Sequence, residues 1–302
     1  MCNDNQTEVT VFILFGFQGL YKYKILFFIL FLFSYLLVIT GNLILVVLVS
    51  MSEHLKIPMF IFLRQLAVAD TLITTTIMPM MLDIILRGKK EVSVTGCLIQ
   101  MYLFGIFGFV QCFLIAVMSY DRCLAICNPM RYNSIMSPDV CRRMIAGSWL
   151  LVFMLSSELI VVCQLQFCGL NFFCDFGPIV ELSTSDTSML LLVDLILSFV
   201  VVFIPFSLII ITYLIIFYTI SKISLNNTRK KAFSTCSSHL ATVCTYYGTL
   251  STVYMTSTDE RSFITNKFCS LLYIVVTPMM NPIIYSLRNH EIRKTLQKVI
   301  NI

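Results

Sequence analysis

Charged residues are scarce in this sequence. Lysine, arginine, aspartate and glutamate together make up 12% of its 302 residues, whereas soluble globular proteins average roughly 25%. Apolar residues make up 58%, and no stretch between the apolar runs is long enough to form a soluble domain. The composition therefore excludes an ordinary soluble protein and predicts a membrane protein.

Histidine is rare as well, and its copies are scattered. His54, His239 and His290 offer no two-histidine spacing of the kind that metal sites use, so we expect no metal, no cofactor and no enzymatic activity. The chain also shows no similarity between its two halves. A secondary transporter would have repeated halves with broken helices in corresponding places, so a membrane transporter is the less favoured alternative.

Long apolar runs account for most of the chain. A helix needs about 20 apolar residues to cross the hydrocarbon core of a bilayer, and these runs are too long and too apolar to be barrel strands. We expect transmembrane helices near residues 25–50, 57–84, 95–127, 141–163, 189–222, 232–257 and 264–287. The expected fold is an all-α, seven-transmembrane helix bundle at 25–287, between an N-terminus at 1–24 and a tail at 288–302.

Two features predict that the N-terminus is extracellular. Asn5 opens a glycosylation acceptor triplet, and residues 1–24 do not read as a cleaved signal peptide. Cytoplasmic segments are enriched in Lys and Arg, and with this orientation they hold twelve such residues against seven on the opposite side. The net charge of +5 therefore reflects membrane topology, and no nucleic-acid partner is expected.

An adjacent acid and base stand near the end of the third apolar run. Asp121 and Arg122 lie within the stretch 118–127. An ionisable residue on a spanning helix must pair, reach the headgroups or face a polar cavity, so it is a functional candidate by default. The alternative is that Arg122 only anchors the helix end among the lipid headgroups.

Motifs in several helices extend this observation. The sequences MSYDRCLAIC at 118–127, KAFSTCSSHL at 231–240 and PMMNPIIYSLRN at 278–289 occur in order. Together they resemble odorant receptors, a branch of the rhodopsin-like G-protein-coupled receptors, over essentially the whole chain. The resemblance implies a multi-pass plasma-membrane receptor that binds small odorant molecules and activates a heterotrimeric, stimulatory olfactory-type G protein to raise cyclic AMP. A chemoreceptor of the same fold acting outside the olfactory epithelium is the alternative.

The resemblance also implies a ligand site in the outer half of the bundle. The expected ligand-binding residues are Phe104, Gly105, Gly108, Phe109, Cys112, Asp194, Leu197, Val201, Tyr247, Leu250, Ser251 and Tyr254. Those on the third helix share one face by helical spacing, and tight helix packing through Gly105 and Gly108 is the alternative to cavity lining. For Asp194 the alternative is contact with the outer headgroups or with water.

Signalling residues are implied at the inner end of the bundle. The expected G-protein coupling and activation residues are Asp121, Arg122, Tyr213, Lys230, Lys231, His239, Asn281, Pro282 and Tyr285. Asn42 and Asp70 correspond to a sodium-binding polar cluster, and a carboxylate in mid-helix is costly unless it holds a cation or shares a polar network. On activation, the inner half of the sixth helix is expected to swing away from Arg122.

The resemblance further implies one disulfide, between Cys97 and Cys174. Among the twelve cysteines, the set on the lumenal side comprises Cys2, Cys97, Cys168 and Cys174, and disulfides form in oxidising compartments. Cys168 lacks the loop cysteine that is its partner in the family, so Cys168 is expected to matter less. Cys2 is the alternative partner.

The tail after the seventh helix has an amphipathic pattern. Ile292, Leu296, Val299 and Ile300 recur at helical spacing with basic residues between them. This pattern predicts a short helix that lies on the membrane surface.

Overall fold

A computed structural model describes most of the chain. It covers residues 10–16, 22–162, 165, 174, 179–180, 183, 185–223, 226–255, 273–285 and 290–300. Within its helices, the side chains of 158–160, 226–228, 231, 234–235, 253–255, 290 and 299–300 are not described.

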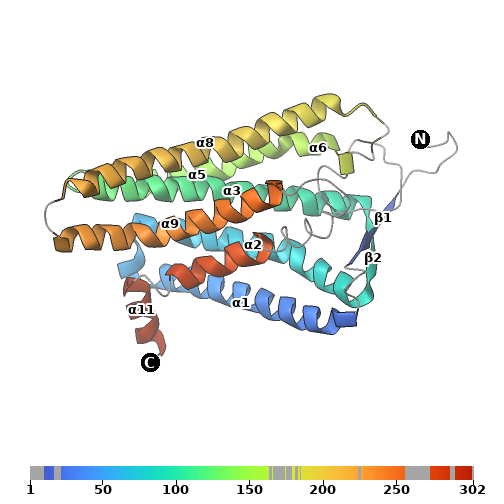
Figure 1. The fold of residues 1–302 in the computed structure, drawn as a ribbon, viewed down its shortest axis with the longest axis horizontal. Helices are drawn as coiled ribbons and strands as arrows, with labels where there is room; N and C mark the ends of the chain where they lie inside the picture. Colours follow the sequence, from blue (N-terminus) through green and yellow to red (C-terminus); the bar gives the residue numbers. More distant parts are fainter. Residues whose placement is uncertain are drawn as a thin grey trace.

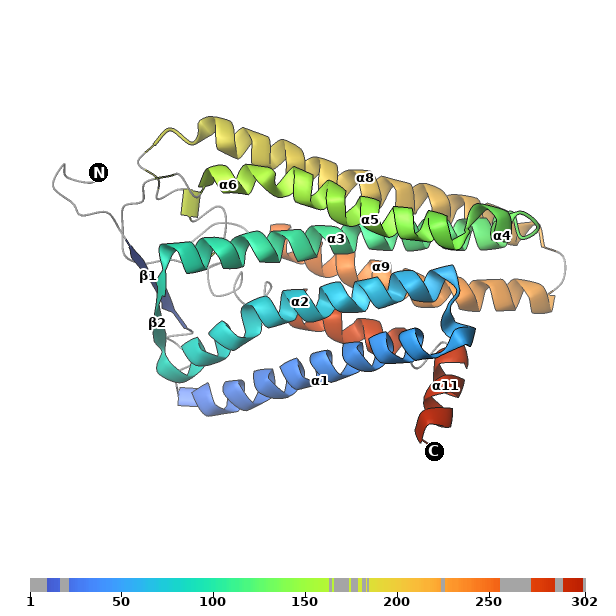
Figure 2. The same ribbon diagram turned by 180° about the vertical axis from the view of Figure 1, so that it is seen from behind.

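Helices running side by side form the body of the molecule (Figures 1 and 2). The long ones are α1 (Lys24–Met51), α2 (Pro58–Arg87), α3 (Val94–Cys127), α5 (Pro138–Leu155), α8 (Ser188–Ser221) and α9 (Asn226–Met255). A shorter apolar helix spans Tyr273–Tyr285. Among the described residues these make up the expected seven-helix bundle, which confirms the predicted fold. Short turns of helix, η2 (Glu53–Leu55), α4 (Tyr132–Ile135), η3 (Ser156–Glu158) and α6 (Leu159–Val162), join or extend them.

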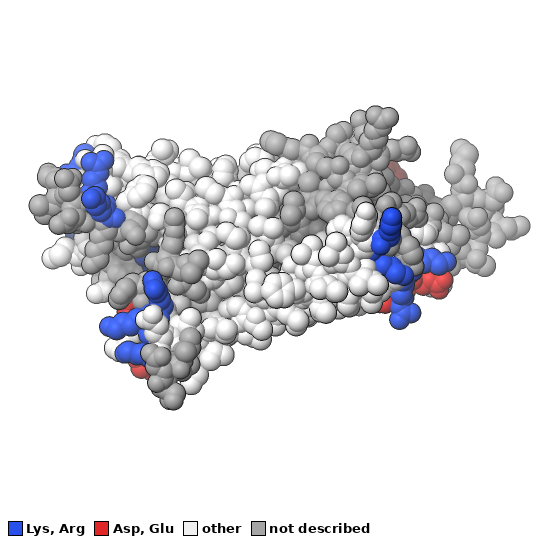
Figure 3. Space-filling model, turned by 60° about the horizontal axis from the view of Figure 1, so that its bottom comes forward, with Lys and Arg blue, Asp and Glu red and all other residues white. Residues whose placement is uncertain are grey.

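The outward faces of the bundle are apolar. Four of the described helices, α1, α2, α3 and α8, are long and apolar enough to cross a membrane. Large apolar side chains are exposed on them, such as Phe33 at 65% and Leu195 at 67%. On the face in Figure 3 the charged side chains gather at the two ends and leave the middle uncharged. An uncharged belt between charged ends is the surface that a bilayer requires.

Helix α3 is the centre of the bundle. It packs against α2, α5, α8 and α9, and its side chains Ile106, Leu114, Ile115 and Met118 are fully buried. We call the end of the bundle that carries β1 and β2 the outer end. The opposite end, with Arg122 and α11 (His290–Ile300), is the inner end.

Two short strands close the outer end, and the sequence analysis did not predict them. β1 (Val11–Phe15) pairs antiparallel with β2 (Lys89–Ser93). Phe12 and Leu14 of β1 are buried, and Phe12 packs into a small cluster around Cys97. The strand Val11–Phe15 is therefore part of the folded outer end. Its five residues are all apolar, so they lack the alternation by which a half-buried strand is recognised.

Four predicted helix boundaries differ from the structure by three or more residues. Helix α2 ends at Arg87 rather than at 84. Helix α5 begins at Pro138 rather than at 141, because the Ser137 side chain accepts a hydrogen bond from the Val140 backbone N–H and caps the helix. It ends at Leu155, and η3 and α6 continue the chain. Helix α9 begins at Asn226 rather than at 232. The predicted loop 222–231 contains neither glycine nor proline, the strongest interrupters of a helix, and its second half belongs to α9.

The remaining helices lie close to their predicted positions. The described part of the last bundle helix, Tyr273–Tyr285, falls inside the predicted range 264–287. The tail forms α11 as expected, and this helix runs across the bundle rather than along it (Figure 1). Ile292 is buried against the bundle, while Arg293 and Lys294 are exposed.

Candidate functional site

The predicted acid and base at the inner end form an ion pair. Asp121 is fully buried, and its Oδ2 lies 3.0 Å from Nη2 of Arg122, whose side chain is 13% exposed. The hydroxyl of Tyr132, on α4, donates to Asp121 Oδ1 over 2.7 Å. Burial and the neighbouring carboxylate raise the pKa of Tyr132, so its hydroxyl remains a donor at neutral pH. Arg122 is therefore paired with Asp121 and largely buried.

Beside this pair, α8 and α9 are joined by a tyrosine and a histidine. The hydroxyl of Tyr213 lies 2.7 Å from Nδ1 of His239, and the two rings are stacked. Both side chains are buried, as is Cys236 one turn before His239. Ser119 of α3 also hydrogen-bonds Thr212 of α8. These contacts join α3, α8 and α9 at the inner end, and we call this arrangement the closed conformation.

The predicted basic residues of this end lie on α9. Lys230 is exposed near the start of the helix, and the side chain of Lys231 lies outside the described residues.

On the last bundle helix, Pro282 and Tyr285 are buried. A Cβ atom at Gly41 of α1 would lie 3.1 Å from Pro282 Cγ, so glycine permits the close approach of these two helices.

A buried carboxylate occupies the centre of the bundle. Asp70 accepts two hydrogen bonds from side-chain amides, one from Gln111 Nε2 to Oδ1 at 2.8 Å and one from Asn281 Nδ2 to Oδ2 at 2.7 Å. Asn42, which was expected to share a sodium-type cluster with Asp70, donates to the carbonyl oxygens of Pro278 and Val38. The amides of Gln111 and Asn281 thus give Asp70 the polar network that a mid-helix carboxylate requires.

Gln111 was not among the predicted site residues. A single glutamine in an apolar helix carries no charge and belongs to no recognised motif. Its position could have indicated a role, because Gln111 lies three residues after Gly108 and so on the same side of α3.

Tyrosines cover the α3 surface that was expected to face a ligand. The hydroxyl of Tyr246 donates to the Gly108 carbonyl oxygen over 2.9 Å and lies 2.8 Å from Cys112 Sγ. A Cβ atom at Gly108 would lie 3.3 Å from the hydroxyl of Tyr273. Gly108 therefore allows the close approach of these tyrosines to α3.

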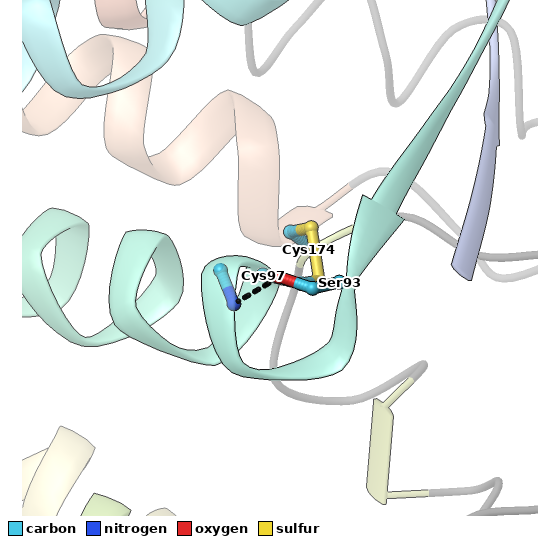
Figure 4. Close-up of a disulfide and its surroundings, with 4 residues drawn as sticks. Ser93, Cys97 and Cys174 are labelled. Atoms are coloured by element: carbon cyan, nitrogen blue, oxygen red, sulfur yellow. Dashed lines mark hydrogen bonds between the residues drawn. A yellow bond between two sulfur atoms is a disulfide. The ribbon is translucent and has the colours of Figure 1, made fainter. Parts of the chain in front are cut away.

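The outer end of α3 is tied down covalently (Figure 4). Cys97 and Cys174 form a disulfide with their Cα atoms 5.2 Å apart, and this is the pair that the family resemblance implied. Ser93 at the end of β2 caps α3, because its Oγ accepts a hydrogen bond from the Gly96 backbone N–H. The predictions for Cys168 and for the glycosylation acceptor Asn5 lie outside the described residues.

Comparison with known proteins agrees with this architecture. The model of a family described as olfactory receptor matches residues 31–301. The chain belongs to the olfactory receptor family. It is an odorant-sensing G-protein-coupled receptor of the plasma membrane and not an enzyme.

Individual relatives resemble the receptor over nearly their whole length. It is 41% identical to human olfactory receptor 11A1 over 99% of this chain and 96% of that protein. It is 39% identical to human olfactory receptor 1M1 over 98% of this chain and 96% of that protein. Its identity to mouse olfactory receptor 5P81 is 42%, over 97% of this chain and 95% of that protein.

The other predicted ligand-binding residues differ in their burial. Val201 of α8 and Tyr247 of α9 are buried, and the Tyr247 ring lies 4.6 Å from that of Phe206 between ring centroids. Ser251 is exposed, and the side chain of Tyr254 is not described. The half-buried members of the set are Phe104, Gly105, Phe109, Asp194, Leu197 and Leu250. The structure thus gathers part of the predicted set in the receptor interior.

Proposed function

We propose that the receptor binds a small, apolar or weakly polar odorant in the outer half of the bundle, between α3, α8, α9 and the segment that carries Cys174. The side chains there are mainly apolar or aromatic, such as Phe104, Val201 and Leu250, as is usual for a small-molecule site. Asp194, half-buried on α8, would favour ligands with an amine or a hydroxyl group if it faces this site.

Activation in this proposal opens the inner end. A ligand shifts the balance between two conformations only by its differential affinity for them. The odorant would favour a packing in which the inner half of α9 moves away from α3 and the Tyr213–His239 contact breaks. Arg122 would then face a cleft that admits a helix of a stimulatory, olfactory-type G protein, and cyclic AMP would rise.

One observation supports this mechanism most directly. Arg122 is paired with Asp121 inside a closed inner end, next to the Tyr213–His239 contact that joins α8 to α9. A buried ion pair is weak evidence for a purely stabilising role, because its desolvation cost can exceed the attraction. Its place at the centre of the inner end fits a role in signalling.

The placement of the chain in the membrane is part of the same proposal. Residues 1–24 lie outside the cell with a glycan on Asn5, residues 25–287 span the bilayer, and residues 288–302 lie in the cytoplasm. The exposed Arg293 and Lys294 beside the buried Ile292 suit α11 to the membrane surface.

The proposal is tested by expressing the receptor with an olfactory-type G protein and screening a chemically diverse odorant panel with a cyclic AMP readout. An agonist found in this way is then applied to Arg122→Ala, which should reach the cell surface and give no response. Arg64→Ala is the matched control, since Arg64 lies near the inner boundary on α2 within 3.5 Å of the exposed Ser50; it should respond normally. Normal agonist responses from Arg122→Ala would contradict the proposal.

A further inference from the structure

A buried tyrosine hydroxyl joins three parts of the bundle at mid-depth. Tyr246 of α9 is 1% exposed. Its hydroxyl donates to the carbonyl oxygen of Gly108 and contacts Cys112 Sγ, both on α3. The hydroxyl of Tyr273, on the last bundle helix, lies 3.5 Å from it.

These contacts continue to the central carboxylate. The Tyr273 hydroxyl also lies 3.5 Å from Gln111 Oε1, and Gln111 Nε2 donates to Asp70. Asn281, on the same helix as Tyr273, donates to the other oxygen of Asp70. An unbroken set of polar contacts therefore runs from α9 through the last bundle helix and α3 to α2.

Tyr246 shares a helix face with the residue that closes the inner end. His239 precedes Tyr246 by two helical turns, and the buried face of α9 between them holds Thr242 and Val243. Residues at this spacing lie on one side of a helix. A movement that turns this face away from α3 therefore strains the Tyr246 contacts and the Tyr213–His239 contact together.

We infer that the Tyr246 hydroxyl is a positioning group that holds α9 and the helix Tyr273–Tyr285 against α3 in the closed conformation, and so sets the basal signal of the receptor. The inference rests on the proposed function, because that signal is the proposed cyclic AMP output. Its hydrogen bonds exist in the closed packing described here. Loss of these hydrogen bonds destabilises the closed packing relative to an open packing. The change equals the net free energy of one hydrogen bond.

The test compares Tyr246→Phe with the wild-type receptor. Phenylalanine keeps the buried ring and removes only the hydroxyl, so surface expression should be unchanged. Basal cyclic AMP per surface receptor should rise roughly two- to tenfold, the range that one net hydrogen bond allows. Tyr273→Phe should have a smaller effect, because its contacts are longer. The double variant should show less than the product of the two single effects.

A second readout does not depend on the G protein. Cys236 is 3% exposed at the inner end, so a thiol reagent should modify it slowly in the closed receptor. Mass spectrometry of the labelled receptor should show faster modification of Cys236 in Tyr246→Phe, by a similar factor. The control is Tyr218→Phe, because Tyr218 is 63% exposed on α8; this variant should change neither readout.

The outcomes separate the inference from the proposed function. Faster labelling of Cys236 with no cyclic AMP from any variant would support the positioning role and contradict the assigned G protein. A basal signal and a Cys236 labelling rate in Tyr246→Phe equal to or below those of the wild type would overturn the inference.

Discussion

The outer end of the receptor is held by a covalent bond and a sheet, whereas the inner end is held by exchangeable polar contacts. At the outer end the Cys97–Cys174 disulfide, β1 and β2 fix the start of α3. At the inner end the Ser119–Thr212 hydrogen bond joins α3 to α8, and the Tyr213–His239 contact joins α8 to α9. Polar contacts can be replaced by others at small net cost, while a disulfide cannot open without reduction. The difference suits a receptor that keeps its ligand end fixed and opens the end that meets its G protein.

The comparison predicts that outer-end variants change the amount of receptor at the cell surface. Cys97→Ser and Cys174→Ser should be retained inside the cell, because a disulfide contributes about 2–4 kcal/mol to stability. Cys168→Ser should reach the surface. Antibody labelling of surface receptor relative to total receptor measures the effect. The control is Cys244→Ser, since Cys244 is an exposed free cysteine on α9. Equal surface levels for Cys97→Ser and Cys244→Ser would show that the disulfide is dispensable.

The strand pair should matter less than the disulfide. Phe12→Ala removes a fully buried ring from the small cluster around Cys97 and leaves a cavity there. Surface expression should fall without being abolished, because the disulfide still fixes α3. Phe33→Ala, at a side chain that is 65% exposed on α1, should retain normal surface expression. If the two variants reach the surface equally well, β1 does not stabilise the outer end.

An inner-end variant should change the signal instead. Tyr132→Phe removes the hydroxyl that donates to Asp121, a loss of about 1 kcal/mol. Because Arg122 is then held less firmly, basal cyclic AMP per surface receptor should rise about fivefold, at unchanged surface expression. Tyr120→Phe, whose side chain is exposed one residue before Asp121, is the control. A fall in surface expression with no change in signal would place Tyr132 in the same class as the outer-end residues.

The parts of the receptor that follow from local sequence were predictable. The seven helices follow from the length and apolar character of their segments. Asp121 and Arg122 stood out because charge is costly on a spanning helix. Contacts between residues far apart in the sequence could be predicted only from the family resemblance. The resemblance implied the disulfide between Cys97 and Cys174, and the structure contains it.

Contacts between distant, individually unremarkable residues could not be predicted. β1 pairs with a strand more than 70 residues later, and its uniform apolar sequence carries no strand period. The contacts of Gln111 with Asp70 and of Tyr246 with Cys112 each join two helices, so they follow only from the folded structure. Helix α9 begins earlier than predicted. No single residue in this segment marks the helix start, so the boundary could not be located from sequence.

The contrast between a fixed outer end and an opening inner end is tested most directly by amide hydrogen exchange in membranes, with and without an agonist from the odorant screen. The account predicts that agonist with G protein present speeds exchange of the α9 amides from Asn226 to His239, while the amides that pair β1 with β2 exchange at the same rate. Faster exchange in the strand pair, with the inner part of α9 unchanged, would contradict it.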